Sequence, residues 1–314
     1  MHPTGPVAAG VWTIVLAAGS GRRLAALTDG VPKQFWSPNG TRSLLDDTLL
    51  RLTPIASPRH SVVVVDRAHH RYLDQTTARR PGIRVLFQPE DRGTAAGVLL
   101  GLTPVLEATS DAAVVVTPSD HAVGDIRQFR RDVLRAVAHL DGQPDAIVLF
   151  GVEPSTPNED YGWITPEPGS TAGLRAVASF VEKPSRDIAE RLMVSGALWN
   201  TMVVVARAET LFDLYWRHLP GLAAVFDEAL QVPPPDRDAF LALQYPELPA
   251  LDFSRHLLAQ ATGLQACAWP QSMGWSDLGT PQRLEGWLAA NTAAGRLRER
   301  RAARATRAST CCPA

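Results

Sequence analysis

The sequence contains little cysteine and no long apolar run. With three cysteines, two of them adjacent near the C-terminus, it offers neither a disulfide scaffold nor a four-ligand zinc site. No stretch approaches the ~18 apolar residues of a membrane-spanning helix, and no charged segment precedes an apolar one at the N-terminus, which argues against transmembrane and secreted proteins. A net charge of −1, from 31 basic and 32 acidic residues, argues against a nucleic-acid coat protein. We therefore expect a cytoplasmic protein without membrane or nucleic-acid partners.

Lysine is almost absent. Lys33 and Lys183 are the two lysines among 31 basic residues, and all the others are arginines. A compact ammonium and a planar guanidinium are not interchangeable against phosphate, so both lysines are candidate functional residues. The alternative is that they are two ordinary exposed side chains.

The first half of the chain alternates short apolar runs with helical patterns. Continuous β-branched runs indicate strands that are buried on both faces, and helices between them indicate a parallel sheet. The expected strands are 12–17, 61–65, 84–88, 112–117 and 146–151, and the expected helices include 94–106 and 126–140. The predicted fold class is α/β, with a Rossmann-like, doubly wound, mostly parallel sheet. Ligands of such sheets bind at the carboxyl ends of the strands.

The second half of the sequence has a different pattern. Prolines punctuate short expected strands at 175–181 and 201–206, and helical patterns follow at 208–218 and 221–231. A length of 314 residues predicts about two units. We assign residues 1–151 to the Rossmann-like half and 152–290 to an addition packed on the same sheet, which forms the second wall of a cleft. Residues 291–314 form an arginine-rich tail that is either a solvated terminus or a contact for an acidic partner or another subunit.

A glycine-rich loop, LAAGSGRRL at 16–24, follows the first expected strand. Its glycines let backbone N–H groups approach an anion. The loop is not a Walker A motif, and Leu24 replaces the third glycine of a dinucleotide fingerprint. By itself it could be a plain tight turn. Arg23 and Lys33, ten residues apart, add two cations that suit a polyphosphate.

Polar residues also follow the third and fourth expected strands. Gln88 can pair with a base edge, since its amide donates and accepts, Gly93 allows a close approach, and Thr94 can cap the next helix. Asp120, in the run PSDH, is well placed to hold Mg²⁺, which prefers one or two protein carboxylates plus phosphate oxygens. Asp277, in WSDLG, is the second candidate carboxylate. For His121 a hydrogen-bonded structural role is favoured over acid–base chemistry.

The run FVEKP contains the second lysine. Glu182 can accept hydrogen bonds from sugar hydroxyls, and Lys183 can neutralise a second, non-nucleotide phosphate. The alternative is an exposed ion pair, worth about 0–1 kcal/mol. The runs YGW at 161–163 and WN at 199–200 add aromatic walls and an amide of the kind found in sugar pockets, although either tryptophan could belong to the core.

Together these runs resemble the sugar-1-phosphate nucleotidyltransferases, and among them the mannose-1-phosphate guanylyltransferases. AAGSGRRL, PKQF, QPEDRGTA, PSDH, YGW, FVEKP, WN and WSDLG occur in the family's order across residues 11–284. The resemblance implies the nucleotidyltransferase fold, similar to glycosyltransferase A, with a nucleotide-binding half at 1–151 and a sugar-phosphate-binding half at 152–290. It also implies transfer of a nucleotidyl group from GTP to mannose 1-phosphate with Mg²⁺ as cofactor.

The resemblance assigns a role to each motif position. The catalytic residues would be Arg23 and Lys33, and the metal ligands Asp120 and Asp277. The nucleotide would contact Ala17, Ala18, Gly19, Gly21, Gln88, Gly93 and Thr94. The sugar phosphate would contact Gly162, Glu182, Lys183 and Asn200.

The sequence also departs from the family pattern. Arg22 stands where the family has threonine, and Thr201-Met202 replaces a Ser-Gly pair, which leaves the sugar open. Many members of the family have a further C-terminal domain that this sequence does not show. The second activity and the oligomeric state of those members are therefore not expected here, and whether the protein forms a homo-oligomer is left open.

The expected reaction needs no general base, because a phosphate monoester is already ionised at neutral pH. Its difficulty is that two anions must meet, and cations relieve this repulsion. Two alternatives remain: a catalytically silent nucleotide-sugar-binding subunit, and a nucleotidyltransferase with another base or sugar specificity, such as the cytidylyltransferases.

Overall fold

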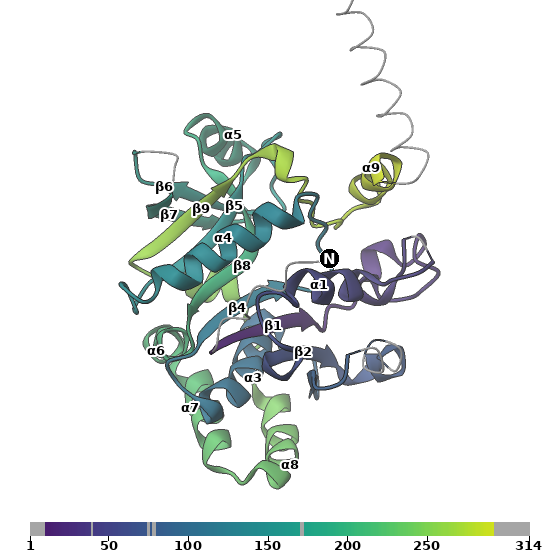
Figure 1. Cartoon of the computed structure of the whole chain (residues 1–314), viewed down its shortest axis with the longest axis vertical. Coiled ribbons are helices and arrows are strands. Elements are labelled where there is room, and N and C mark those ends of the chain that lie inside the picture. Colours follow the sequence, from purple (N-terminus) through teal and green to yellow (C-terminus); the bar gives the residue numbers. More distant parts are fainter. Residues whose placement is uncertain (1–9, 39, 74–75, 77–79, 170–172, 292–314) are drawn as a thin grey trace, which may run out of the picture.

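The computed structural model describes residues 10–38, 40–73, 76, 80–169 and 173–291 (Figure 1). Its strands are β1 (Val11–Ala17), β2 (Ser61–Asp66), β3 (Arg84–Gln88), β4 (Ala113–Pro118), β5 (Ile147–Val152), β6 (Gly162–Pro166), β7 (Leu174–Glu182), β8 (Leu198–Arg207) and β9 (Leu264–Trp269). Its α-helices are α1 (Leu44–Leu52), α3 (Gly93–Ala108), α4 (Ile126–His139), α5 (Arg186–Val194), α6 (Ala208–His218), α7 (Pro220–Gln231), α8 (Pro234–Gln244) and α9 (Pro281–Asn291). Every strand and helix range named from the sequence overlaps one of these elements, whereas β6 and β9 were not anticipated.

These strands form one sheet in the order β3-β2-β1-β4-β8-β5-β9-β7-β6. The α/β class and the Rossmann-like first half are confirmed, since β3, β2, β1 and β4 are all parallel. The expectation of a mostly parallel sheet fails in the second half. There β8 runs antiparallel between β4 and β5, and β6 and β7 pair only antiparallel. A further β6–β8 pairing joins β8, β5, β9, β7 and β6 in a closed ring of strands.

The valine-rich strands β2, β4 and β5 are buried on both faces, as expected. The strand at 84–88 is an exception. As β3 it is the edge strand of the sheet, and Phe87 is 38% exposed. An apolar run therefore does not separate an edge strand from a central one.

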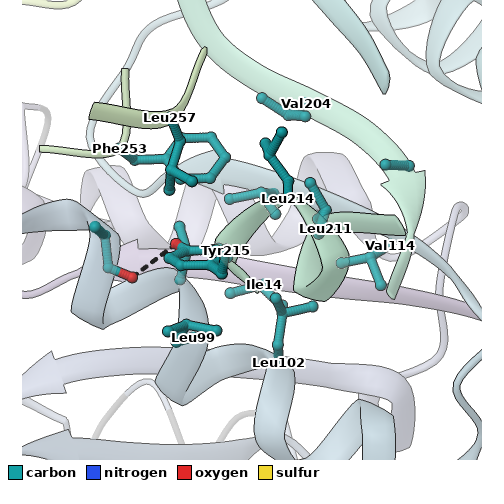
Figure 2. Packing of buried hydrophobic residues seen from close by; sticks show 14 of the residues in the cluster. Ile14, Leu99, Leu102, Val114, Val204, Leu211, Leu214, Tyr215, Phe253 and Leu257 are labelled. Atoms are coloured by element: carbon teal, nitrogen blue, oxygen red, sulfur yellow. Dashed lines mark hydrogen bonds between the residues drawn. The ribbon is translucent and has the colours of Figure 1, made fainter. Parts of the chain in front are cut away.

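Helices cover both faces of the sheet (Figure 1). One face packs against α3, α6 and α7, and the other against α1 and α4, so that neighbouring residues of a strand join opposite cores. Figure 2 shows the first core, in which Ile14 and Val114 meet Leu211 and Leu214. Tyr215 is fully buried there, and its hydroxyl donates to the carbonyl of Ala95 at 2.7 Å. Each such apolar side chain contributes about 1.5–3 kcal/mol when buried.

Residues 1–151 and 152–290 both contribute strands to this one sheet, and β8 of the second segment lies between β4 and β5 of the first. In the described part of the chain, no helix has the length and apolar character needed to cross a bilayer. The arginine-rich tail lies outside the described residues except for Asn291.

Candidate active site

The predicted site residues gather at one edge of the sheet. Strands β1, β2, β3, β4, β5 and β9 run in the same direction, so their carboxyl ends share this edge. A hollow of about 660 Å³ opens there, here called the central hollow. Of the predicted residues, its lining includes Ala18, Gly19, Arg23, Gln88, Gly93, Thr94, Asp120 and Lys183. The other predicted residues are not among its lining residues: Ala17, Gly21, Lys33, Gly162, Glu182, Asn200 and Asp277.

The glycine-rich loop is fixed by the segment that carries Lys33. Gly21 has φ of 63°, and an added Cβ there would lie 2.8 Å from the backbone nitrogen of Lys33. Only glycine meets both constraints without strain. The side chain of Gln34, 2% exposed, donates to the carbonyls of Ala17 at 2.8 Å and Gly19 at 2.9 Å. The sequence motif contains Gln34, but its role in shaping the loop was not predicted.

Lys33 connects the two predicted metal ligands. Its Nζ lies 2.8 Å from Oδ2 of Asp120 and donates to the backbone carbonyl of Asp277. Burial raises the pKa of Asp120, but the charge and hydrogen bond of Lys33, together with contributions from His121 and a backbone amide, outweigh burial and hold that pKa below its usual range. Residues far apart in the sequence, after β4 and after β9, thus meet around one buried ammonium.

Two hydrogen-bond donors and one cation hold the carboxylate of Asp277. Its Oδ1 accepts from the Tyr161 hydroxyl at 2.8 Å and the Gly279 amide at 3.2 Å, and lies 3.0 Å from Nε of Arg283. The guanidinium of Arg283 also lies 5.0 Å from the centre of the Tyr161 ring and contacts Asp160 at 3.3 Å. Arg283 comes from α9 and is not a predicted site residue, since an arginine in a helical pattern resembles an ordinary surface charge.

Asp120 and Asp277 are hard oxygen donors of the kind that a magnesium ion takes, and its remaining ligands would come from substrate. Within the described residues, no group of three or more His, Cys, Asp or Glu side chains is arranged to hold a metal ion. Mg²⁺ commonly needs only one or two protein carboxylates together with phosphate oxygens and water. Asp120 and Asp277 each use one oxygen for a cation, and each retains a second oxygen of the hard type that Mg²⁺ prefers.

Gln88 and the start of α3 form another wall of the central hollow. The Gln88 side chain is 3% exposed and interacts with the hydroxyl of Tyr245, although its Nε2 makes no hydrogen bond of ordinary geometry among the described residues. Gly93 has φ of 77°, and a Cβ there would lie 2.3 Å from the carbonyl oxygen of Leu251. The backbone around Leu251, which lines the hollow, is therefore what approaches Gly93 closely.

Thr94 does not cap α3 as predicted. The N-cap is Arg92, which makes no side-chain capping bond, and the Thr94 hydroxyl instead accepts from the amide of Phe253 at 2.7 Å. The reason is that the 250–253 segment also bonds the first turn of α3 through Leu251, which occupies the space beside the helix terminus.

The predicted sugar-phosphate residues lie on three neighbouring strands. A Cβ on Gly162 would lie 2.5 Å from Oε2 of Glu182, so glycine leaves room for that carboxylate. Burial raises the pKa of Glu182, and the nearby Asp252 adds to this. The Lys183 ammonium lies 3.5 Å from Glu182 with a half-exposed side chain, and it reaches the central hollow. Asn200 is buried and donates to Ser254 at 3.3 Å.

Met202 also lines the central hollow, in a left-handed conformation with φ of 61°. Its amide donates to Oδ1 of Asn200 at 3.0 Å, and its sulfur accepts from the Ser254 hydroxyl at 3.4 Å. A left-handed residue with a side chain costs about 1–2 kcal/mol, so this position holds local strain beside the hollow.

His121 does not make the side-chain hydrogen bonds expected of a structural histidine. Its Nδ1 has no partner among the described residues, and its ring packs edge-on against Trp275 with centroids 5.4 Å apart. Burial lowers the pKa of His121 to about 4, although Asp120 opposes this, so its side chain is neutral at pH 7.

Sequence comparison matches residues 12–293 to the family described as "Nucleotidyl transferase". The xanthan biosynthesis protein XanB of Xanthomonas campestris is 30% identical over 278 residues, which cover 86% of this chain and 58% of XanB. A mannose-1-phosphate guanylyltransferase of Sinorhizobium fredii is 29% identical over 279 residues, covering 85% of this chain and 52% of that protein. The chain thus spans less than two thirds of the length of these relatives.

Structure comparison gives the same fold. A crystal structure titled mannose-1-phosphate geranyltransferase, from Thermus thermophilus, has a TM-score of 0.79 with 28% identity, covering 89% of this chain and 79% of the other. A Bacillus anthracis protein titled glucose-1-phosphate thymidylyltransferase is 15% identical with a TM-score of 0.54, covering 89% and 94%, which supports the fold alone.

Proposed function

Because the chain belongs to the nucleotidyl transferase family, we propose that it transfers a nucleotidyl group from GTP to mannose 1-phosphate, releasing pyrophosphate. The observation that carries this proposal is the buried Lys33, which joins Asp120, in the lining of the central hollow, to the Asp277 segment. Arg23 and Lys183 are the cations of the lining with side chains toward the surface. This distribution of charge suits two phosphate-bearing substrates that meet in one hollow.

In the proposed reaction, a phosphate oxygen of the sugar 1-phosphate attacks the α-phosphorus of the triphosphate. A new P–O bond forms as the bond from the α-phosphorus to the α,β-bridging oxygen breaks, and that oxygen leaves with pyrophosphate. No proton needs to be removed, since the attacking phosphate is already ionised near pH 7. The neutral His121 agrees with a site in which no base is required.

We assign different roles to the charged groups in and beside the central hollow. Arg23 and the backbone N–H groups of the glycine-rich loop are placed to bind the triphosphate, while Lys183 neutralises the sugar phosphate. Asp120 and Asp277 would hold Mg²⁺, which when bound would screen the charge of the phosphates. Fixed charges that need no reorganisation contribute most of the rate enhancement in such reactions.

The choice of substrates follows from two features. Gln88 contributes an amide to the lining of the hollow, which suits a base that both donates and accepts hydrogen bonds. Relatives such as the S. fredii protein are named as acting on mannose 1-phosphate with guanylyl transfer. The chain's own residues beside the acceptor, Glu182 and Asn200, offer a carboxylate and an amide for sugar hydroxyls.

The test is a pyrophosphate-release assay that crosses GTP, UTP, dTTP, ATP and CTP with mannose, glucose and galactose 1-phosphates. We expect the highest kcat/KM for GTP with mannose 1-phosphate in the presence of Mg²⁺, and loss of turnover in Asp120→Asn. Maximal activity with another pair of substrates would show that the proposed specificity for GTP and mannose 1-phosphate is wrong. Binding of nucleotide without turnover for any pair would instead support a silent nucleotide-sugar-binding subunit.

A further inference from the structure

A second hollow of about 660 Å³ is lined by neighbours of Asp277, among them Ser276 and the hydrogen-bonded Tyr161. Four aromatic rings line it: Tyr161, Trp199, Trp275 and Trp287. The rings of Tyr161 and Trp199 lie 4.9 Å apart, and those of Tyr161 and Trp275 5.5 Å apart. We call this site the aromatic hollow. The proposed reaction uses neither its volume nor its tryptophans.

Polar groups sit among these rings. Asn158 and Gln282 bring amide groups, and Ser155 and Thr156 bring hydroxyls. The indole N–H groups of Trp199 and Trp275 have no acceptor among the described residues. A ligand pocket typically combines apolar and aromatic walls with a few polar groups that fix orientation, and this hollow has that composition and an ordinary ligand-site volume.

The charge of the aromatic hollow favours a neutral ligand. Arg283 is the one cation among its described lining residues, and it is already paired with Asp277 at 3.0 Å and Asp160 at 3.3 Å. A phosphate would therefore find no free positive charge there and would face the Asp160 carboxylate. A sugar ring fits better, because its C–H faces pack on aromatic rings and its hydroxyls pair with amides and carboxylates.

The aromatic hollow also contacts the groups that hold Asp277. Tyr161 and Arg283 both line the hollow; the Tyr161 hydroxyl donates to Oδ1 of that carboxylate, and Arg283 forms an ion pair with it. A ligand that touches either side chain would change the restraint on the carboxylate of Asp277, one of the two predicted metal ligands. Lys33 contacts both the Asp277 backbone and Asp120, which lines the central hollow, so a chain of contacts connects the two hollows.

We propose that the aromatic hollow binds a neutral saccharide and that its occupancy alters Mg²⁺-dependent turnover through Arg283 and Tyr161. The binding is independent of the proposed function, while the effect on turnover rests on it. The site would let a free sugar, or the sugar portion of a glycan, regulate synthesis of an activated sugar.

Saturation-transfer NMR of the full chain with D-mannose, D-glucose and maltose as probes tests the binding. We expect a signal from at least one probe in the wild type. Trp287→Ala should weaken its affinity by about tenfold, or 1.4 kcal/mol. Trp216→Ala is the matched control, because Trp216 is 40% exposed on α6 outside the hollow and should leave binding unchanged.

Two further variants distinguish a loss of saccharide binding from a loss of folding and from a change in the central hollow. Gln282→Ala removes an exposed amide of the hollow without touching the core, so it should weaken binding even if Trp287→Ala impairs folding. Lys183→Met changes only the central hollow and should bind the saccharide as the wild type does. No signal from any probe, or equal binding by wild type and Gln282→Ala, would overturn the proposed site.

Turnover is measured separately, with the nucleotide and sugar 1-phosphate pair that proves most active. A bound saccharide should change kcat or the Mg²⁺ dependence in the wild type and in Trp216→Ala, and the change should be reduced in Gln282→Ala. Saccharide binding without such a change would refute the coupling alone. If no substrate pair is turned over, the proposed function fails while the binding result stands.

Discussion

The two lysines permit a matched comparison of a buried cation with an exposed one. Lys33→Met keeps the length of the side chain and removes the ammonium that lies 2.8 Å from Asp120. Breaking a fully buried pair by removing one partner costs about 3–5 kcal/mol. The Asp120 side chain is 27% exposed, so water relieves part of this penalty, and we expect a loss of roughly 2–3 kcal/mol in unfolding free energy.

The same change should reduce catalysis. Removing one preorganised charge or donor typically lowers kcat by about 10²–10³. Since the charge of Lys33 lowers the pKa of Asp120 against the effect of burial, the pKa should rise in Lys33→Met. The acid limb of the pH–activity profile should then move to higher pH. Urea unfolding followed by tryptophan fluorescence measures the stability, and pyrophosphate release across pH measures the activity.

Lys183→Met is the control for this comparison. Its ammonium lies 3.5 Å from Glu182 and its side chain is 50% exposed, so the stability should change by about 0–1 kcal/mol while KM for the sugar 1-phosphate rises. In the double variant Lys33→Met/Asp120→Asn, removing both charges should recover much of the lost stability without restoring turnover. If Lys33→Met unfolds and turns over like the wild type, Lys33 is not the organising charge of the site.

Three other substitutions test the glycine-rich loop, the N-terminal capping of α1 and the residues predicted to contact the sugar phosphate. Gly21→Ala places a methyl group 2.8 Å from the backbone nitrogen of Lys33 at positive φ, so it should cost about 1–3 kcal/mol and raise KM for the nucleotide; unchanged denaturation and kinetics would contradict the tight-turn assignment. Asp46 accepts hydrogen bonds from Arg80 and from Ser43, the N-cap of α1, and together these outweigh burial and lower its pKa. Asp46 therefore stabilises the fold above its unfolded pKa, near 3.8. Asp46→Asn should therefore lose about 2 kcal/mol at pH 7, and urea titrations should show this difference shrinking as the pH falls below about 3.8. Gly162→Ala would push a methyl group against the carboxylate that faces it from β7, and steady-state kinetics should show a higher KM for the sugar 1-phosphate with KM for the nucleotide unchanged.

The first half of the fold follows from local pattern. Continuous apolar runs and helical periods gave β1, β2, β4 and β5 within a residue or two of their observed bounds. The order and direction of the strands in the second half did not follow from local pattern. They depend on contacts between segments far apart in the sequence. Nothing in the run at 198–207 shows that it lies antiparallel between β4 and β5, and the five-residue β6 gives too short a pattern to recognise.

For the site, the sequence by itself determined which chemistry is available: glycines that free a loop, two lysines, and carboxylates in recognisable runs. Only the tertiary structure decided which groups meet, because the contacts around Asp277, in the loop after β9, come from Lys33, from Tyr161 before β6 and from Arg283 on α9. It also assigned Thr94 to the 250–253 segment and gave Arg283 and Gln34 their supporting roles. Side-chain identity is a local property of the chain, whereas the distance between two charges is set by the packing of the whole sheet.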